Sequence, residues 1–123
     1  MIHEAYVSFE TAKLLKERGF DYDETHMFYS SFDSDRIFPI TEIGLVKDED
    51  VYYAPTHQMA CAWLREVHKI HIEISPVSGK GYGAILCDVG DFDDFNYIGE
   101  TDYFFHAEEA AEAALKYSLE NLI

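Results

Sequence analysis

Residues 55–74 carry a helix pattern that passes into a strand pattern with almost no loop between them. After Pro55, apolar side chains recur at a helical spacing, which predicts a helix that ends near His68. The stripe expected to face the core consists of Met59, Trp63 and Val67, with Ala60 and Leu64 beside it. Isoleucines then alternate with polar residues over residues 70–74, as in a strand with one buried face. We therefore expect this strand to lie close against the helix before it.

Two more segments, residues 8–18 and 107–121, have helical patterns with start signals of their own. Ser8 can cap the first segment through its side-chain oxygen, and His106 occupies the equivalent position before the second. Acidic residues in each first turn favour a helix because they complement its dipole. Gly19 supplies the left-handed residue that commonly ends a helix.

Strand patterns occupy the gaps between these helices. Residues 82–88 are expected to pair with residues 70–74 through a turn at residues 77–81, after Pro76 ends the ladder. Other strand candidates are residues 26–32, 42–46, 51–53 and 103–105. This order of elements predicts an α+β fold in which three helices pack on one face of a mainly antiparallel sheet. A length of 123 residues suits a single domain spanning residues 1–123.

The chain has 24 acidic against 9 basic side chains, a formal charge of −15. Such a chain repels nucleic-acid phosphates and anionic lipid headgroups, so we expect no direct nucleic-acid partner and no membrane partner. No apolar run approaches the roughly 18 residues of a membrane span, and residues 1–4 lack the pattern of a signal peptide. We therefore expect a cytoplasmic protein.

The negative charge is concentrated toward the C-terminus, where residues 81–123 hold ten acidic residues and one basic residue. The candidate interaction surface consists of six acidic residues in this part: Asp88, Asp91, Asp93, Asp94, Glu100 and Asp102. A calcium loop is disfavoured, because Phe95 and Asn96 occupy positions where the EF-hand pattern requires a ligand and a glycine. Mimicry of DNA by this segment alone is also disfavoured, because one acid per roughly 8 Å is far sparser than duplex phosphates. It would need further acids on the same face, for example Asp21, Asp23 and Glu24, or Asp48, Glu49 and Asp50.

Aromatic residues are interleaved with these acids, at Phe92, Phe95, Tyr97, Tyr103, Phe104 and Phe105. Two interpretations are open. The segment is either a solvated acidic loop whose phenylalanines fold back onto the sheet, or a face that binds another protein, since aromatic residues are enriched at protein interfaces.

No catalytic pattern is recognisable, so an enzyme is the less favoured class. Cys61 and Cys87 are too far apart for a CxxC metal or redox motif, and we expect no metal and no cofactor. The glycine-rich residues 79–83 precede a strand and lack the order of a phosphate-binding loop. The alternative hypothesis is a small-molecule or enzymatic site assembled from residues dispersed in sequence: His57, His68, His71 and Tyr52 or Tyr53. A third is a homo-oligomeric structural component.

Three stretches, residues 8–21, residues 54–74 (APTHQMACAWLREVHKIHIEI) and residues 108–123, resemble small uncharacterised proteins from gut Bacteroidetes and their phages or prophages. The resemblance implies a phage or mobile-element protein made in a bacterial cytoplasm, and it carries no catalytic residue. Small acidic proteins of this kind resemble inhibitors of host defence or nucleic-acid machinery. The leading hypothesis is an accessory protein that binds another protein with a basic surface.

Overall fold

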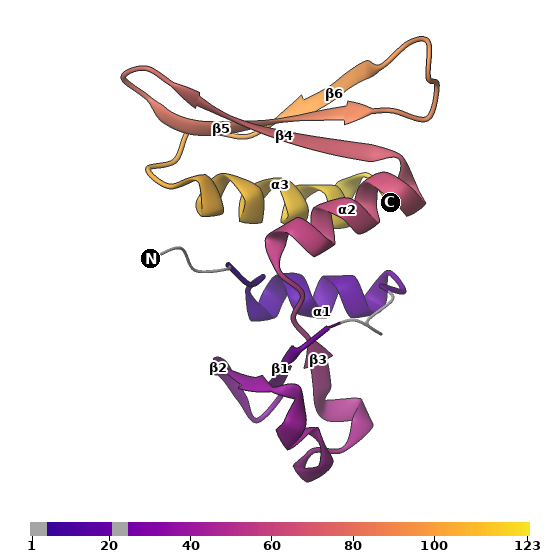
Figure 1. Ribbon diagram of the computed structural model, residues 1–123, viewed down its shortest axis with the longest axis vertical. Helices are drawn as coiled ribbons and strands as arrows, with labels where there is room; N and C mark the ends of the chain where they lie inside the picture. Colours follow the sequence, from indigo (N-terminus) through magenta and orange to yellow (C-terminus); the bar gives the residue numbers. More distant parts are fainter. Residues whose placement is uncertain (1–4, 21–24) are drawn as a thin grey trace. The chain divides into compact units, whose positions relative to one another are not determined.

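A computed structural model describes residues 5–20 and 25–123, and these residues adopt an α+β fold (Figure 1). The described residues form three α-helices, two short 3-10 helices and two antiparallel sheets of three strands each. The predicted fold class is therefore confirmed, with its antiparallel strands divided between two sheets. The chain forms two compact units, Met1–Thr56 and His57–Ile123, each of which contains one of the sheets.

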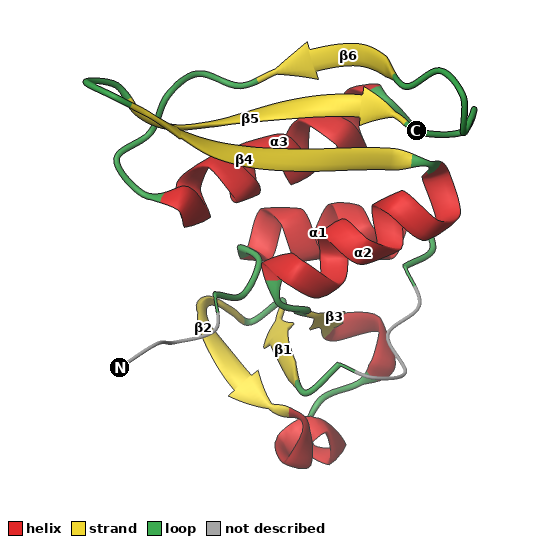
Figure 2. Cartoon of the chain, turned by 45° about the horizontal axis from the view of Figure 1, so that its top comes forward, coloured by secondary structure: helices red, strands yellow, loops and turns green. Residues whose placement is uncertain are grey.

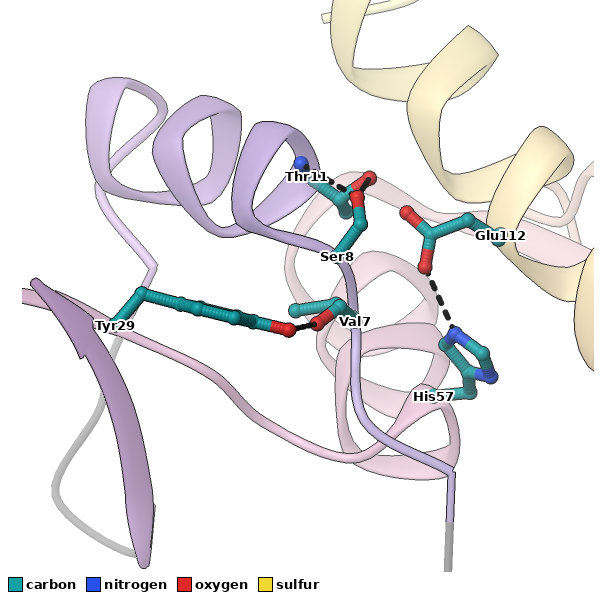
Figure 3. Close-up of polar contacts among 6 residues, drawn as sticks. All are labelled: Val7, Ser8, Thr11, Tyr29, His57 and Glu112. Carbon is teal, nitrogen blue, oxygen red and sulfur yellow. Dashed lines mark hydrogen bonds and ion pairs between the residues drawn. The ribbon is translucent and has the colours of Figure 1, made fainter. Parts of the chain in front are cut away.

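The first unit combines helix α1 (Phe9–Glu17) with strands β1 (Met27–Ser30), β2 (Asp33–Pro39) and β3 (Val51–Tyr53). The sheet order is β2-β1-β3, and α1 packs on β3. The predicted cap is confirmed, because the Ser8 hydroxyl accepts a hydrogen bond from the Thr11 amide at 3.2 Å (Figure 3). Gly19 has a φ of +80° and ends the helix as predicted.

The predicted strand at residues 42–46 is wrong. A 3-10 helix, η1 (Ile40–Leu45), occupies this stretch, and a second short one, η2 (Asp48–Asp50), leads into β3. Gly44 weakens a strand at this position, and Leu45 is 87% exposed, so its apolar side chain faces no sheet core. Strand β2 was not predicted because its first four residues are exposed and polar, which gives no alternation of hydrophobicity.

The second unit combines helices α2 (His57–His68) and α3 (Ala107–Asn121) with strands β4 (Ile70–Val77), β5 (Gly81–Asp88) and β6 (Asn96–Glu100). The sheet order is β4-β5-β6, and both helices cover the same face of this sheet (Figure 2). The predicted direct passage from helix to strand is confirmed. Lys69, with a φ of +60°, turns the chain from α2 into β4 without a longer loop.

The core of the second unit lies between this sheet and its two helices. Leu86 is fully buried at the centre of the middle strand, where it is paired with Ile72 on one side and Gly99 on the other. The residues with 0% exposure that the helices contribute are Ala60, Leu64, Ala110, Ala114, Leu115, Ser118 and Leu119. The stripe predicted in α2 is therefore displaced: Ala60 and Leu64 are buried, whereas Val67 is 57% exposed.

Three further strand predictions for the second unit need correction. The β4–β5 ladder does not end at Pro76 but continues to Val77, because β4 is an edge strand, where proline is tolerated. Of residues 103–105, Phe104 alone forms a bridge, with Tyr82. Strand β6 was not predicted because its sequence lies within the acidic stretch. No helix in the described parts of the chain is long and apolar enough to cross a membrane.

Candidate interaction surface

The six acidic residues predicted as an interaction surface lie along β5, β6 and the segments that follow these strands. Asp88 ends β5 and Glu100 ends β6, whereas Asp91, Asp93 and Asp94 lie in the connection between the two strands. Asp102 lies two residues after the end of β6. All six residues are exposed, and none of their carboxylates has an ion-pair partner among residues 5–20 and 25–123.

Two of these carboxylates also shape the loop between β5 and β6. Asp88 Oδ1 accepts a hydrogen bond from the Gly90 amide at 2.8 Å, and Asp91 Oδ1 accepts one from the Asp93 amide at 3.0 Å. Such side-chain bonds to nearby amides stabilise tight turns. Asp88 and Asp91 therefore have a local structural role. The carboxylates of Asp93, Asp94 and Asp102 accept no hydrogen bond from the residues that the structure describes.

Five of the six aromatic residues of the same region are exposed to solvent, and Phe104 is half-buried. Phe92 is 89% exposed, Phe95 59% and Tyr97 61%. The interpretation that the phenylalanines of this loop fold back onto the sheet is therefore wrong. We use the name acidic-aromatic surface for the six carboxylates together with Phe92, Phe95 and Tyr97.

One face of the β4-β5-β6 sheet is covered by α2 and α3, and the other face carries polar and half-exposed side chains. On this outer face Ile85 of β5 is paired with Glu73 of β4 on one side and with Glu100 of β6 on the other. Ile85 is 40% exposed, and both glutamates are exposed. Two strand spacings separate the glutamates, about 10 Å, so two negative charges flank one apolar side chain.

A shallow hollow of about 70 Å³ lies on this outer face; we name it the sheet hollow. Its walls include the ring of Tyr103, the side chain of Glu100 and that of Ile85. The Tyr103 ring packs closely on Gly83, because a Cβ built on Gly83 would lie only 3.1 Å from ring atoms. The Nζ atom of Lys80 lies 5.1 Å from the centroid of the same ring.

Sequence reasoning identified Glu100 and Tyr103 but missed Glu73, Gly83 and Ile85. A signal for Glu73 was present, because it lies on the polar face of an alternating strand. Its position beside Ile85 also depends on the register of the β4–β5 hairpin. The structure fixes that register by pairing Val77 with Gly81.

Tyr97 and Glu100 interact across the end of β6. The pKa of Tyr97 is raised above its ordinary value. The largest cause is local desolvation, followed by the charge of Glu100 and its hydrogen bond with the Tyr97 hydroxyl. Glu100 therefore faces two aromatic residues, Tyr97 and Tyr103, and has acceptor sites left over for a further donor.

Of the histidines considered for a dispersed site, His57 and His68 lie at opposite ends of α2. His57, at the start of α2, forms a contact of 2.9 Å with Glu112 of α3 (Figure 3). His68 is at the other end of the same helix, about 16 Å away at the rise of an α-helix. His71 is paired with Cys87 in the β4–β5 ladder.

His68 packs edge-to-face on the ring of Trp63 at 4.8 Å between centroids. Its Nε2 atom is buried and has no hydrogen-bond partner among the described residues. The described part of the chain contains no group of three or more His, Cys, Asp or Glu side chains that could hold a metal ion. The three histidines therefore do not form one site.

Tyr52 and Tyr53 belong to the first unit, on β3. The ring of Tyr52 stacks edge-to-face with Phe9 at 5.1 Å and lies 4.4 Å from the Nζ atom of Lys16. Lys16 Nζ also donates hydrogen bonds to the carbonyl oxygens of Glu49 at 3.3 Å and of Val51 at 2.9 Å. The lysine thus anchors the segment that leads into β3.

A pocket of about 520 Å³ lies in the first unit beside Lys16. Its apolar lining is Ala12, Leu15, Phe20 and Val51, and its polar lining includes Asp48 and Tyr53. Of the further acids considered for DNA mimicry, Asp48, Glu49 and Asp50 form η2. Asp21, Asp23 and Glu24 lie outside the described residues.

Cys61 does not have the setting of a nucleophile. Burial raises the pKa of the Cys61 thiol to about 11, an effect that the charge of Arg65 only partly offsets. A thiolate is needed for nucleophilic attack, so this thiol is unreactive near neutral pH. Cys87 is half-buried on the middle strand of its sheet, and both thiols are free.

Comparison of the chain with protein-family models, with curated proteins and with solved structures finds no match.

Proposed function

We propose that the protein is a non-enzymatic accessory protein that binds another protein through the acidic-aromatic surface. The observation that carries the proposal is the joint exposure of six carboxylates without ion-pair partners in the described chain and three aromatic side chains in one region. Exposed aromatic rings supply apolar contact area, and unpaired carboxylates select a partner of opposite charge. The partner is therefore a protein with a basic surface.

The resemblance to proteins of gut Bacteroidetes and their phages supports a biological setting for this proposal. In that setting the protein is made in the bacterial cytoplasm and inhibits host defence or nucleic-acid machinery. Proteins that bind nucleic acid present basic grooves, and a surface with an excess of carboxylates can occupy such a groove.

The test is the binding of the purified chain to a set of basic nucleic-acid-binding proteins of the bacterial host at increasing salt concentration. We expect the affinity to fall as salt rises, because Coulomb attraction between exposed groups is screened. A triple variant, D93N/D94N/D102N, removes three charges that have no described structural role. It should bind about tenfold more weakly, or about 0.5 kcal/mol for each charge lost.

The matched control is E17Q/E108Q/E120Q, which removes three exposed charges elsewhere in the chain. This control should lose less than about threefold in affinity, through net charge alone. An affinity that does not change with salt, or an equal loss in both triple variants, would contradict the proposed use of this surface.

The pocket of the first unit favours a second candidate function, the binding of a small molecule. Its volume of about 520 Å³ and its lining of apolar residues with one lysine and one aspartate match the usual composition of ligand sites. A fragment screen by NMR tests it: ligand-induced shifts should centre on Ala12, Lys16 and Val51, and their absence would remove this candidate.

A further inference from the structure

We infer that the sheet hollow is a subsite for an arginine side chain of the protein partner. This inference rests on the proposed function and names the group that the partner presents. The residues that line the hollow include one with a carboxylate, Glu100, one with an aromatic ring, Tyr103, and apolar ones such as Ile85. A long cationic side chain needs these three features, since its stem is apolar and its head is charged.

The charge around the hollow supports a cationic occupant. Glu73 and Glu100 lie on either side of Ile85, and neither has a cationic partner among the described residues. A cation between them would be attracted by both carboxylates at once. An anionic occupant would be repelled by both, and a neutral one would leave both charges unpaired.

The shape of the hollow favours arginine over lysine. A guanidinium group is planar and can stack on the Tyr103 ring while its N–H groups donate to the carboxylate of Glu100. Gly83 lets the Tyr103 ring lie close against β5, where it forms one wall of the hollow, because a larger residue would place a Cβ 3.1 Å from ring atoms. An ammonium group makes a point contact and gains less from a flat wall.

Lys80 provides an internal precedent and a competitor. Its Nζ atom already lies 5.1 Å from the Tyr103 ring centroid, within the range of a cation–π interaction. Removal of this positive charge should therefore strengthen the binding of an external cation. Removal of Lys80 should thus strengthen cation binding, whereas removal of a carboxylate should weaken it. This contrast distinguishes the sheet hollow from a surface whose affinity depends on the number of carboxylates only.

The test is an NMR titration of the whole chain with a short synthetic peptide that alternates threonine and arginine. Two matched peptides carry lysine or neutral citrulline in place of arginine. In about 0.1 M salt, amide shifts should centre on Gly83, Ile85 and Thr101, arginine should bind about threefold more tightly than lysine, and citrulline should not bind.

Variants of the walls test the assignment residue by residue. E100Q and Y103L should each weaken arginine binding by about three- to tenfold, whereas Y103F should remain within about twofold of the parent. K80Q should strengthen binding by about twofold. The control E108Q removes an exposed charge at the start of α3 and should change binding by less than about twofold.

Shifts that centre on residues 88–95, or equal losses in E100Q and E108Q, would overturn the inference and leave the proposed function intact. The same holds if the arginine peptide fails to bind while the basic host proteins bind with the expected salt dependence. If neither the peptide nor any basic protein binds, both the inference and the proposed function are wrong.

Discussion

Truncation of Leu86 to alanine tests the packing of the second unit at its centre. Leu86 has 0% exposure and is paired with Ile72 and Gly99 on the two neighbouring strands. The change removes three carbon atoms, which at about 0.8 kcal/mol per buried methylene is about 2.4 kcal/mol. The cavity left behind adds to this value, so we expect a loss of about 3 kcal/mol in the free energy of unfolding.

The adjacent residue of the same strand provides a matched control. Ile85 loses carbon atoms in a similar way when it is changed to alanine, but its side chain lies on the outer face and is 40% exposed. We expect Ile85→Ala to cost about 1 kcal/mol or less, because less apolar area leaves water when this residue folds. The two variants therefore differ by about 2 kcal/mol through the face of the sheet alone.

Urea unfolding followed by the fluorescence of Trp63 measures both variants. Trp63 is the single tryptophan of the chain and lies on α2, within the same unit as the mutated strand. The dependence of the free energy on urea should be unchanged, so that the shift in midpoint reports stability directly. If Ile85→Ala costs as much as Leu86→Ala, the assignment of the two faces of β5 is wrong.

Three further predictions concern single positions. Gly81→Ala should destabilise the second unit by at least about 2 kcal/mol more than Gly79→Ala. Both glycines have a positive φ, but only at Gly81 would a Cβ collide with the Phe104 carbonyl oxygen. Urea unfolding of the two variants measures the difference. With a pKa of about 11, Cys61 is about 0.1% thiolate at pH 8, so a thiol reagent should modify it about 100-fold more slowly in the folded chain than in urea. The modification rate of the folded chain should rise about tenfold per pH unit up to that pKa. An equal rate in both states would refute the effect of burial. Ser8→Ala should cost about 1 kcal/mol and speed hydrogen exchange in the first turn of α1, whereas Ser8→Asp should keep the cap and leave exchange near the parent rate.

The helices were predictable from the sequence because their boundaries depend on local chemistry. Ser8 and Gly19 mark the two ends of α1, and the observed bounds of α3 agree with the predicted residues 107–121. The cap at His106 includes a hydrogen bond from its own amide to the Glu109 carboxylate at 3.1 Å. Such contacts involve residues within one turn, so they can be read without knowledge of the tertiary structure.

The edge strands were not predictable in the same way. β2 and β6 are paired on one side only, and most of their side chains are exposed, so neither shows the alternation that marks a half-buried strand. Backbone pairing with a neighbour defines these strands, and that pairing depends on residues distant in sequence. The prediction of the buried stripe in α2 failed for the same reason. Which elements pack on the helix decides that Leu64 is buried and Val67 is exposed.

One part of the candidate site was predictable from the sequence and another part was not. The carboxylates and aromatic residues of the acidic-aromatic surface were visible as a local excess of charge and rings in residues 88–102. The sheet hollow was not visible, because Glu73 and Glu100 are brought to either side of Ile85 by the register of two strand pairs. A pattern within one segment predicts what that segment exposes, whereas a hollow lined by several strands can be predicted only when their pairing is known.

The position of the acids at a sheet edge also bears on which proteins can approach it. β6 is a short edge strand whose pairing with β5 is interrupted by a register shift, and Asp94, Glu100 and Asp102 lie beside its two ends. An edge strand can pair with the same strand of a second copy, and proteins suppress such pairing with bulges and charged side chains. Two copies of this edge would bring like charges together. The charge that disfavours a homo-oligomer through β6 is therefore the same charge that, under the proposed function, attracts a basic partner. Under the proposed function, the neutralising variant D93N/D94N/D102N should therefore weaken partner binding and at the same time raise the tendency to self-associate. Sedimentation of the variant and of the parent protein at equal concentration would show the difference in self-association.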